Sequence, residues 1–242
     1  MIRAVGFDLD DTILDHRGAA SAGIAALLKQ QGWVYEGVTE LGKEWQRLEQ
    51  LHFAEYIAGN LTLIQQRRAR MRNFLAMVEV EAHDAELDDL FKEFLSHYAN
   101  SWVAFPDVRP TLENLNHLGF RLAVLTNGQQ EQQEAKLASM GFLEMFDSIL
   151  AIGSLTAPKP DARAFLELSS ALGCAPEQVV YVGDDPHWDA IAATKAGLHG
   201  VWLNRAGHEG PDGIGIQVRT LDSLVAAIHE WSGRIAPQGQ SL

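Results

Sequence analysis

The chain opens with a short run of apolar, β-favouring residues that ends in acids. Residues 2–7 (IRAVGF) have the pattern of a short buried strand, and Asp8 follows them at once. From Gly18 to about Trp102 the apolar positions instead recur at helical spacing, without strand-like runs. The pattern therefore predicts one strand followed by a long, all-helical block.

Start signals and apolar stripes mark the helices of this block. Thr62 and Gln65 have the spacing of a capping box ahead of a helix over 67–77. Two further amphipathic stripes follow Thr39 (Leu41, Trp45, Leu48 and Leu51) and Asp84 (Leu87, Leu90, Phe91, Phe94 and Tyr98).

After Pro106 the pattern alternates between strands and helices. Strands are predicted at 120–126, 146–152, 178–183 and 199–203, and helices at 111–118, 130–140, 161–172 and 187–196, each followed by a glycine that suits a C-cap. We expect a loop at 206–215, a last helix at 221–231 and a frayed tail from Gly233. Such alternation predicts right-handed βαβ units and a parallel sheet.

The first strand is separated from the other strands by the helical block. The economical interpretation is an α/β fold, a Rossmann-like three-layer core with a central parallel sheet, plus an inserted all-helical cap domain. We expect residues 1–15 and 105–242 to form the catalytic core and residues 16–104 to form the cap.

Composition and charge narrow the class of partner. The 242 residues include 19 Lys and Arg against 32 Asp and Glu, a net charge of −13 that argues against nucleic acid and anionic membranes. Cys174 is the single cysteine, so no internal disulfide is expected. Acids come too early for a signal peptide, and no run approaches the roughly 20 apolar residues of a membrane helix. We expect a cytoplasmic protein, either a monomer or a homodimer.

Polar groups follow four of the predicted strands. Asp8 and Asp10 follow the first strand and point to the same side, because side chains alternate along an extended segment. Two adjacent carboxylates repel unless a cation lies between them or one is protonated. The remaining groups are Thr126, Asn127 and Gly128 after the second strand, Lys159 between two prolines after the third, and Asp184, Asp185 and Asp189 after the fourth.

Each of these segments alone has an ordinary explanation as a turn, a helix cap or a solvated loop. Their common place at the C-terminal ends of parallel strands changes this interpretation, since ligands bind there in α/β folds. Together they offer carboxylates for a hard divalent cation, donors for an anion, and an ammonium group. Oxygen ligands in this number suit Mg²⁺ held together with a substrate phosphate.

In chain order, the segments FDLDDT, TNG, KP and VGDDPHWD followed by AIAATKAG resemble the four motifs of the haloacid dehalogenase (HAD) superfamily. The resemblance covers residues 1–16 and about 105–205, and the helical insert resembles a C1-type cap in size and position. It implies a phosphoric monoester hydrolase of the phosphatase-like branch that uses Mg²⁺. The substrate would be a small phosphorylated metabolite of the nucleotide, sugar phosphate or flavin mononucleotide type. The approach to the lysine, SLTAPKPD, departs from the Gly-containing pattern that is commonest in the family.

The resemblance also implies catalytic roles. Asp8 matches the nucleophile that forms an aspartyl phosphate, and Asp10 matches the general acid/base. Thr126 and Asn127 match the phosphate-holding motif, and Lys159 matches the lysine that stabilises the phosphate oxygens. These roles agree with phosphoryl transfer, which depends mainly on positioning and charge neutralisation.

The metal site is implied in the same way. Asp8, Asp184 and the backbone carbonyl of Asp10 would hold Mg²⁺, which shields the nucleophile from the charge of the phosphate. Asp189 matches the acid that positions the lysine. Asp185 stands where family members vary, so no role is assigned to it.

Three other functions compete with a phosphatase. A haloacid dehalogenase uses the same nucleophile on carbon but needs neither a metal nor an acid two residues on, so Asp10 and Thr12 favour phosphate. A phosphomutase would return the phosphoryl group to a sugar, and the motifs do not separate it from a phosphatase. A receiver-like signalling module also uses an Asp cluster, Mg²⁺ and Lys, but it carries its phospho-acceptor on a later strand.

Four arginines of the helical block, Arg67, Arg68, Arg70 and Arg72, offer positive charge in an acidic chain. They either meet an anionic part of the substrate or form a solvated face with nearby acids.

Overall fold

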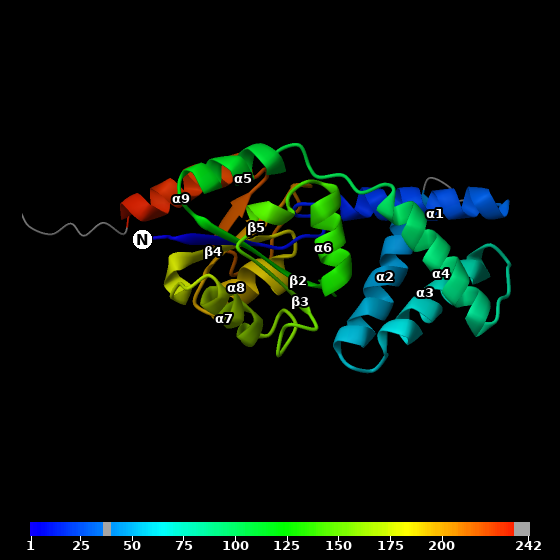
Figure 1. The fold of residues 1–242 in the computed structure, drawn as a ribbon. Helices are drawn as coiled ribbons and strands as arrows, with labels where there is room; N and C mark the ends of the chain where they lie inside the picture. The colour runs from blue at the N-terminus through cyan, green and yellow to red at the C-terminus, as the bar shows by residue number, and fades with distance from the viewer. Residues whose placement is uncertain (36–39, 235–242) are drawn as a thin grey trace, which may run out of the picture. The chain divides into compact units, whose positions relative to one another are not determined.

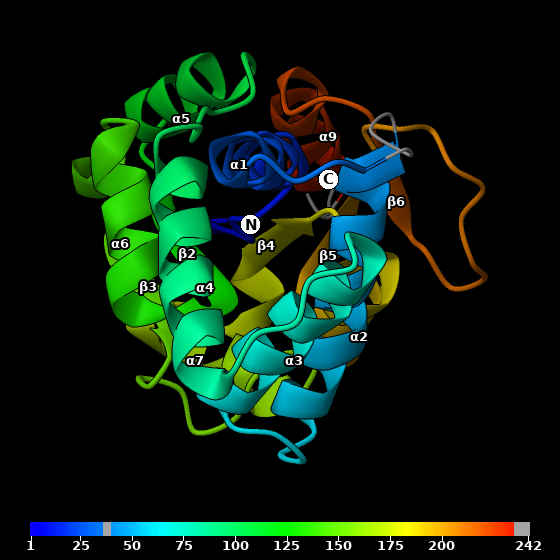
Figure 2. The ribbon, with the colours of Figure 1, turned by 90° about the vertical axis from the view of Figure 1, so that its right-hand side faces the viewer.

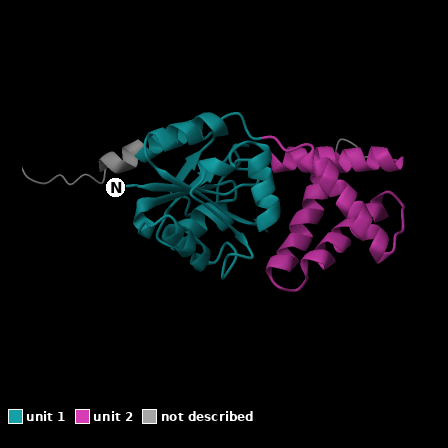
Figure 3. Ribbon diagram, in the orientation of Figure 1, with its two compact units in different colours: residues 1–14, 104–242 teal, residues 15–103 magenta. Residues whose placement is uncertain are grey.

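The computed structural model describes residues 1–35 and 40–234. The chain divides into two compact units, unit 1 with residues 1–14 and 104–242 and unit 2 with residues 15–103 (Figure 3). Thr39 and the tail beyond residue 234 lie outside the described residues. None of the helices described is long and apolar enough to cross a membrane.

Unit 1 is built on a parallel sheet. Its strands are β1 (Ala4–Phe7), β2 (Arg121–Gln129), β3 (Ser148–Ile152), β4 (Val179–Gly183), β5 (His199–Leu203) and β6 (Ile216–Val218). They pair in the order β3-β2-β1-β4-β5-β6, which can be followed from left to right in Figure 2. The predicted α/β fold with a central parallel sheet is confirmed. The sixth strand is an addition, because β6 pairs with β5 in a segment, directly after the predicted loop at 206–215, for which the sequence pattern predicts no element.

Helices cover both faces of this sheet. They are α5 (Val108–His117), α6 (Gln130–Ser139), α7 (Ala162–Ala171), α8 (Ala192–Lys195) and α9 (Asp222–Arg234), with 3₁₀ turns η2 (Leu143–Met145) and η3 (Pro176–Gln178) and a π-helical segment η4 (Pro186–Ile191). Helices α7 and α8 pack together below the sheet in Figure 1, and α5 and α9 pack together above it. The helix predicted at 187–196 therefore begins as a π-helical segment. Such segments are rare and often occur at functional sites.

The central strands β1 and β4 are buried along their whole length. This explains why their sequences are continuous apolar runs instead of alternating ones. Beneath them, the rings of Phe165 on α7 and Tyr181 on β4 meet edge to face at 5.1 Å. Gly6 makes this packing possible, since a Cβ there would lie 2.5 Å from the Leu168 side chain. The C-terminal ends of these buried central strands carry the polar groups described below.

Unit 2 is helical throughout the part that the structure describes. It contains α1 (His16–Gln31), α2 (Leu41–Ile57), α3 (Leu63–Met77) and α4 (Asp84–Ala99). Trp45 is fully buried at its centre, with the rings of Phe74 and Phe94 at 5.5 and 4.5 Å. The predicted capping box is present, since Gln65 N donates to Thr62 Oγ1 and Thr62 N donates to Gln65 Oε1.

The arginines of α3 are engaged inside unit 2. Arg68 donates to Asp84 and Asp88 of α4, and Arg72 donates to Asp84. These contacts favour the solvated ion-pair face over a substrate contact for Arg68 and Arg72. Arg67 lies over the Phe91 ring at 5.4 Å.

Arg70 differs from its neighbours because it is buried. Its guanidinium lies 4.1 Å from the centre of the Trp45 ring and donates to Glu49 at 2.8 Å. Glu49 also bonds to His16 at 3.0 Å, and His16 bonds to the Tyr98 hydroxyl at 2.7 Å. A partly buried polar chain thus connects α1, α2, α3 and α4.

Candidate active site

The C-terminal end of β1 places Asp8 at the centre of the polar groups. The backbone N–H of Asp8 donates to Val182 O on β4, and its side chain is buried. Lys159 reaches it from the loop after β3, with Nζ 2.6 Å from Asp8 Oδ1. The same ammonium donates to Asp189 Oδ1 at 2.7 Å and to the Tyr181 hydroxyl at 3.0 Å. Lys159 therefore joins the candidate nucleophile to the acid of the fourth motif.

Burial and charge shape the titration of this group. Burial raises the pKa of Asp8 to about 7, against the ammonium of Lys159, which lowers it. The carboxylate of Asp189 adds to the rise. Burial alone would lower the pKa of Lys159, but Asp189 and Asp8 raise it well above its ordinary value. The lysine is thus held as a cation beside the nucleophile.

Gly183 makes room for Asp189. A Cβ at Gly183 would lie 2.2 Å from the Asp189 carboxyl carbon. A glycine is therefore needed here because the Asp189 side chain approaches the backbone closely, and not because the backbone has a positive φ. Asp189 Oδ2 accepts from the backbone N–H of Asp185 at 3.1 Å. The Asp185 side chain accepts from the backbone N–H groups of His187 and Trp188, both at 2.8 Å, and so caps η4. Asp185 therefore has a structural role as the cap of η4, which the sequence pattern does not indicate.

Asp8, Asp184 and Asp189 form a cluster in which one carboxylate oxygen from each residue lies within 4.8 Å of the others. When ionised, these three groups and the single ammonium of Lys159 leave a local charge of −2. A divalent cation would balance that charge, and carboxylate oxygens are the ligands that Mg²⁺ prefers. The residues present therefore fit a divalent metal. The side chain of Asp10 lies outside this cluster and has other partners.

Asp10 belongs to a second network that the sequence analysis missed. Lys136 Nζ donates to both oxygens of Asp10, at 2.6 and 2.8 Å, and Gln133 Nε2 donates to Asp10 Oδ2 at 3.1 Å. Gln133 Nε2 also donates to Thr126 Oγ1 at 2.7 Å. Both residues lie on the buried face of α6 beside Leu137. In the sequence, the one sign of this network is that Gln133 and Lys136 are three residues apart on the helix face that also carries the apolar Leu137.

The TNG segment is a strand end and not a turn, because β2 continues to Gln129. Gly128 gives space to the side chain of Gln133, whose Nε2 would lie 2.1 Å from a Cβ at this position. Asn127 Nδ2 donates to Lys159 O, and Lys159 N donates to Asn127 Oδ1, both at 2.8 Å. The Asn127 side chain is thus bonded to the backbone of the lysine loop, and the phosphate contact that the family resemblance implies for it stays a prediction.

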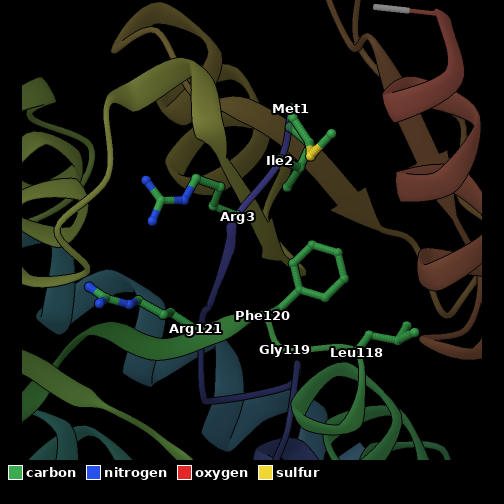
Figure 4. A pocket seen from close by; sticks show the side chains of 7 residues that line it. All are labelled: Met1, Ile2, Arg3, Leu118, Gly119, Phe120 and Arg121. Carbon is green, nitrogen blue, oxygen red and sulfur yellow. The ribbon is translucent and has the colours of Figure 1, made fainter. Parts of the chain in front are cut away.

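A pocket of about 320 Å³ lies at the N-terminal ends of strands β1 and β2 (Figure 4). It is lined by Met1, Ile2, Arg3, Leu118, Gly119, Phe120 and Arg121. These residues precede or begin β1 and β2, whereas Asp8 and Thr126 lie at the opposite ends of these strands. The pocket is therefore separate from the polar cluster.

Comparisons with known proteins agree with this geometry. A glyceraldehyde 3-phosphate phosphatase of Methanopyrus kandleri is 28% identical over 221 residues, covering 86% of this chain and 87% of its own. The structure of a HAD-hydrolase from Bacillus subtilis bound to magnesium matches with a TM-score of 0.81 and 21% identity, over 94% of this chain and 98% of its own. A 2-haloacid dehalogenase from Pseudomonas syringae matches with a TM-score of 0.67 and 28% identity, over 96% and 100% of the two chains.

The family assignment rests on a match that spans most of the chain and includes the four motif segments. Residues 2–197 match the family model described as haloacid dehalogenase-like hydrolase. The parallel sheet, the buried Asp8–Lys159–Asp189 group and the oxygen-rich cluster with Asp184 are consistent with that match. The chain therefore belongs to the haloacid dehalogenase-like hydrolases and is an enzyme.

Proposed function

We propose that this hydrolase is a Mg²⁺-dependent phosphatase acting on a small phosphorylated metabolite of the nucleotide, sugar phosphate or flavin mononucleotide type. One observation carries the proposal: the buried Lys159 ammonium lies between Asp8 and Asp189, with Asp184 in the same cluster. A carboxylate nucleophile beside fixed positive charge and a place for a divalent cation suits an incoming phosphate. The relatedness to a glyceraldehyde 3-phosphate phosphatase supports this substrate class.

In the first half of the proposed reaction, Asp8 attacks phosphorus. Asp8 Oδ1 accepts from Lys159, while Oδ2 accepts no hydrogen bond from the residues that the structure describes. The new bond joins an Asp8 oxygen to phosphorus as the bond to the leaving oxygen breaks. Asp10 enters this step in its protonated form and gives its proton to that oxygen, while Lys159 and the Thr126 hydroxyl stabilise the phosphate oxygens.

In the second half, water attacks the aspartyl phosphate and Asp10 takes its proton. The bond between Asp8 and phosphorus breaks, which releases inorganic phosphate and restores the carboxylate. Asp8 and Asp184, with the backbone carbonyl of Asp10, would hold Mg²⁺, which supplies charge neutralisation when bound. Asp189 keeps Lys159 in place, and Asn127 is proposed to fix the backbone around the lysine.

The principal rival is dehalogenation by the same nucleophile, which the related Pseudomonas syringae structure makes a concrete alternative. That chemistry needs neither Asp184 as a metal ligand nor an acid at Asp10. The two buried networks around Asp8 and Asp10 therefore favour phosphate. A phosphomutase would share every step as far as the aspartyl phosphate, and it would differ in returning the phosphoryl group to a sugar instead of to water.

A direct test screens phosphate release from nucleotides, sugar phosphates, glyceraldehyde 3-phosphate and flavin mononucleotide, with and without Mg²⁺. Halide release from 2-haloacids and mutase products from sugar phosphates are measured in parallel. Asp8→Asn should abolish phosphate release and leave the fold intact, because the amide is nearly isosteric but a very poor nucleophile. Activity of Asp8→Asn within tenfold of the wild type, or halide release in place of phosphate release, contradicts the proposal.

A further inference from the structure

Helix α6 presents two buried polar side chains to the reaction site. Gln133 and Lys136 are three residues apart, so they share one face of the helix. The Gln133 side chain is fully buried, and that of Lys136 is 3% exposed. A lysine is almost never this buried unless it is paired, and here its partner is the carboxylate of Asp10.

These contacts fix the orientation of Asp10. Lys136 donates to both carboxylate oxygens and Gln133 donates to Oδ2, so three hydrogen bonds hold the group. The Asp10 side chain nevertheless keeps 29% of its surface exposed, unlike Lys136. Asp10 is thus held by the side chains of α6 while part of its surface stays accessible.

Gln133 also sets the direction of the Thr126 hydroxyl. Thr126 Oγ1 accepts from Gln133 Nε2 at 2.7 Å and from the backbone N–H of Gly128 at 3.2 Å. A hydroxyl oxygen accepts two hydrogen bonds, so its own hydrogen must be directed to a third partner. The hydroxyl hydrogen can then be donated to a substrate oxygen.

We propose that Gln133 and Lys136 are positioning residues for phosphoryl transfer. Lys136 holds the Asp10 side chain beside the leaving oxygen of the substrate. Gln133 bonds to both Asp10 and Thr126 and so fixes the position of these two side chains relative to each other. This inference rests on the proposed phosphatase function. Neither residue is assigned a contact with substrate, because both act through Asp10 and Thr126.

The test compares two substrates with different leaving groups. An alkyl phosphate needs the proton from Asp10, whereas 4-nitrophenyl phosphate needs it much less. Because kcat/KM reports the steps up to the departure of the leaving group, Lys136→Met should lower it roughly 10²-fold for the alkyl ester and only a few-fold for the aryl ester. Gln133→Met should lower kcat/KM for both substrates, because both use the Thr126 hydroxyl.

Double variants separate positioning from direct action. In an Asp10→Asn background, Lys136→Met should cause little further loss, since residues that act as a unit are not additive. The matched controls are Gln132→Met on the same helix and Lys195→Met on the exposed face of α8, both expected to behave as the wild type. Equal losses of Lys136→Met on the two esters, or a full further loss in the Asp10→Asn background, overturns the inference.

A crystal structure of Lys136→Met tests the inference without any substrate. The Asp10 carboxylate should leave its position or occupy several rotamers, while Asp8 and Lys159 stay in contact. An unchanged Asp10 carboxylate overturns the positioning role. A wild-type enzyme that releases no phosphate from any ester would instead refute the proposed function, and the crystal structure would still decide whether Lys136 places Asp10.

Discussion

Asn127 and Lys159 exchange two hydrogen bonds of 2.8 Å, and neither bond involves the lysine ammonium. The amide of Asn127 satisfies the backbone N–H and C=O of Lys159, both in a buried region. A single side chain at the end of β2 thereby fixes the loop that carries the lysine. With the backbone of Lys159 fixed in this way, its side chain places Nζ between Asp8 and Asp189.

We predict that Asn127→Ala weakens both stability and catalysis. Two buried backbone groups of Lys159 would lose their partners, which should cost about 2 kcal/mol or more of unfolding free energy. The value of kcat should fall more than the affinity for substrate, because the lysine loses its fixed place in the transition state. Urea unfolding and steady-state kinetics measure the two effects. Asn114→Ala on the exposed face of α5 is the control, and equal behaviour of the two variants would contradict the role.

We predict that Gly183→Ala displaces Asp189. The new Cβ would lie 2.2 Å from the carboxyl carbon, so the side chain or η4 must shift. Overpacking of this kind costs about 1–3 kcal/mol, and Lys159 would lose one of its partners. Gly215→Ala is the matched control, since a Cβ there meets nothing within 4 Å. Wild-type activity and stability in Gly183→Ala would remove the argument for close approach.

The sequence was sufficient for the parallel sheet because apolar runs and helical stripes alternate without ambiguity after Pro106. It was not sufficient for β6, since Ile216–Val218 is too short to have a period and forms a strand by pairing with β5. The π-helical start of the helix at 187–196 was not predicted either, for a related reason. Its backbone follows the contacts of Asp185 and Asp189, which helical periodicity does not report.

The candidate site divides in the same manner. Asp8, Asp184 and Lys159 come together because strand order and parallel direction bring strand ends to one edge, which a sequence pattern can indicate. Lys136 and Asp10 are 126 positions apart, and their pairing depends on how α6 lies beside β2. On a helical pattern, Lys136 is read as a solvated residue. Tertiary packing alone places it in the core.

We predict that Mg²⁺ stabilises the wild-type protein and that Asp184→Asn removes the effect. A ligand that binds the folded state alone adds about 2.7 kcal/mol at one hundred times its Kd. Thermal unfolding with Mg²⁺ and with a chelator measures the shift, and the assay of phosphate release follows in the same samples. Asp185→Asn is a control for charge, because Asp185 caps η4 instead of joining the cluster. A chelated enzyme with full activity would remove the metal from the mechanism.

We predict that Arg68→Gln leaves the ranking of substrates unchanged. Three donors of Arg68 are already used by Asp84 and Asp88, so the side chain is committed within unit 2. Ratios of kcat/KM among several natural phosphates provide the measurement. A changed ranking would show that the arginine leaves these acids to meet the substrate.

The last prediction concerns the pH dependence of unit 2. Burial opposes the ionisation of Glu49, but Arg70 and His16 prevail and hold its pKa well below the ordinary value of 4.5. A carboxyl group whose pKa is lowered by folding contributes stability above its unfolded pKa and loses it as the pH falls towards the folded value. Arg70 keeps its charge throughout this range.

The Glu49→Gln variant should therefore be less stable than the wild type near neutral pH by about 1.5–3 kcal/mol, the range for hydrogen bonds to charged groups, because the Glu49 side chain is only partly buried, with 24% of its surface exposed. The difference in unfolding free energy between wild type and variant should stay level from pH 6 down to about 4.5 and shrink below it. Urea unfolding at intervals between pH 3 and 6 provides the measurement, with the exposed Glu81→Gln as the control. If the difference in unfolding free energy instead grows as the pH falls, the ionised Glu49 carboxylate destabilises the folded state. The charge of Arg70 would then be stabilised by the Trp45 ring instead of by Glu49.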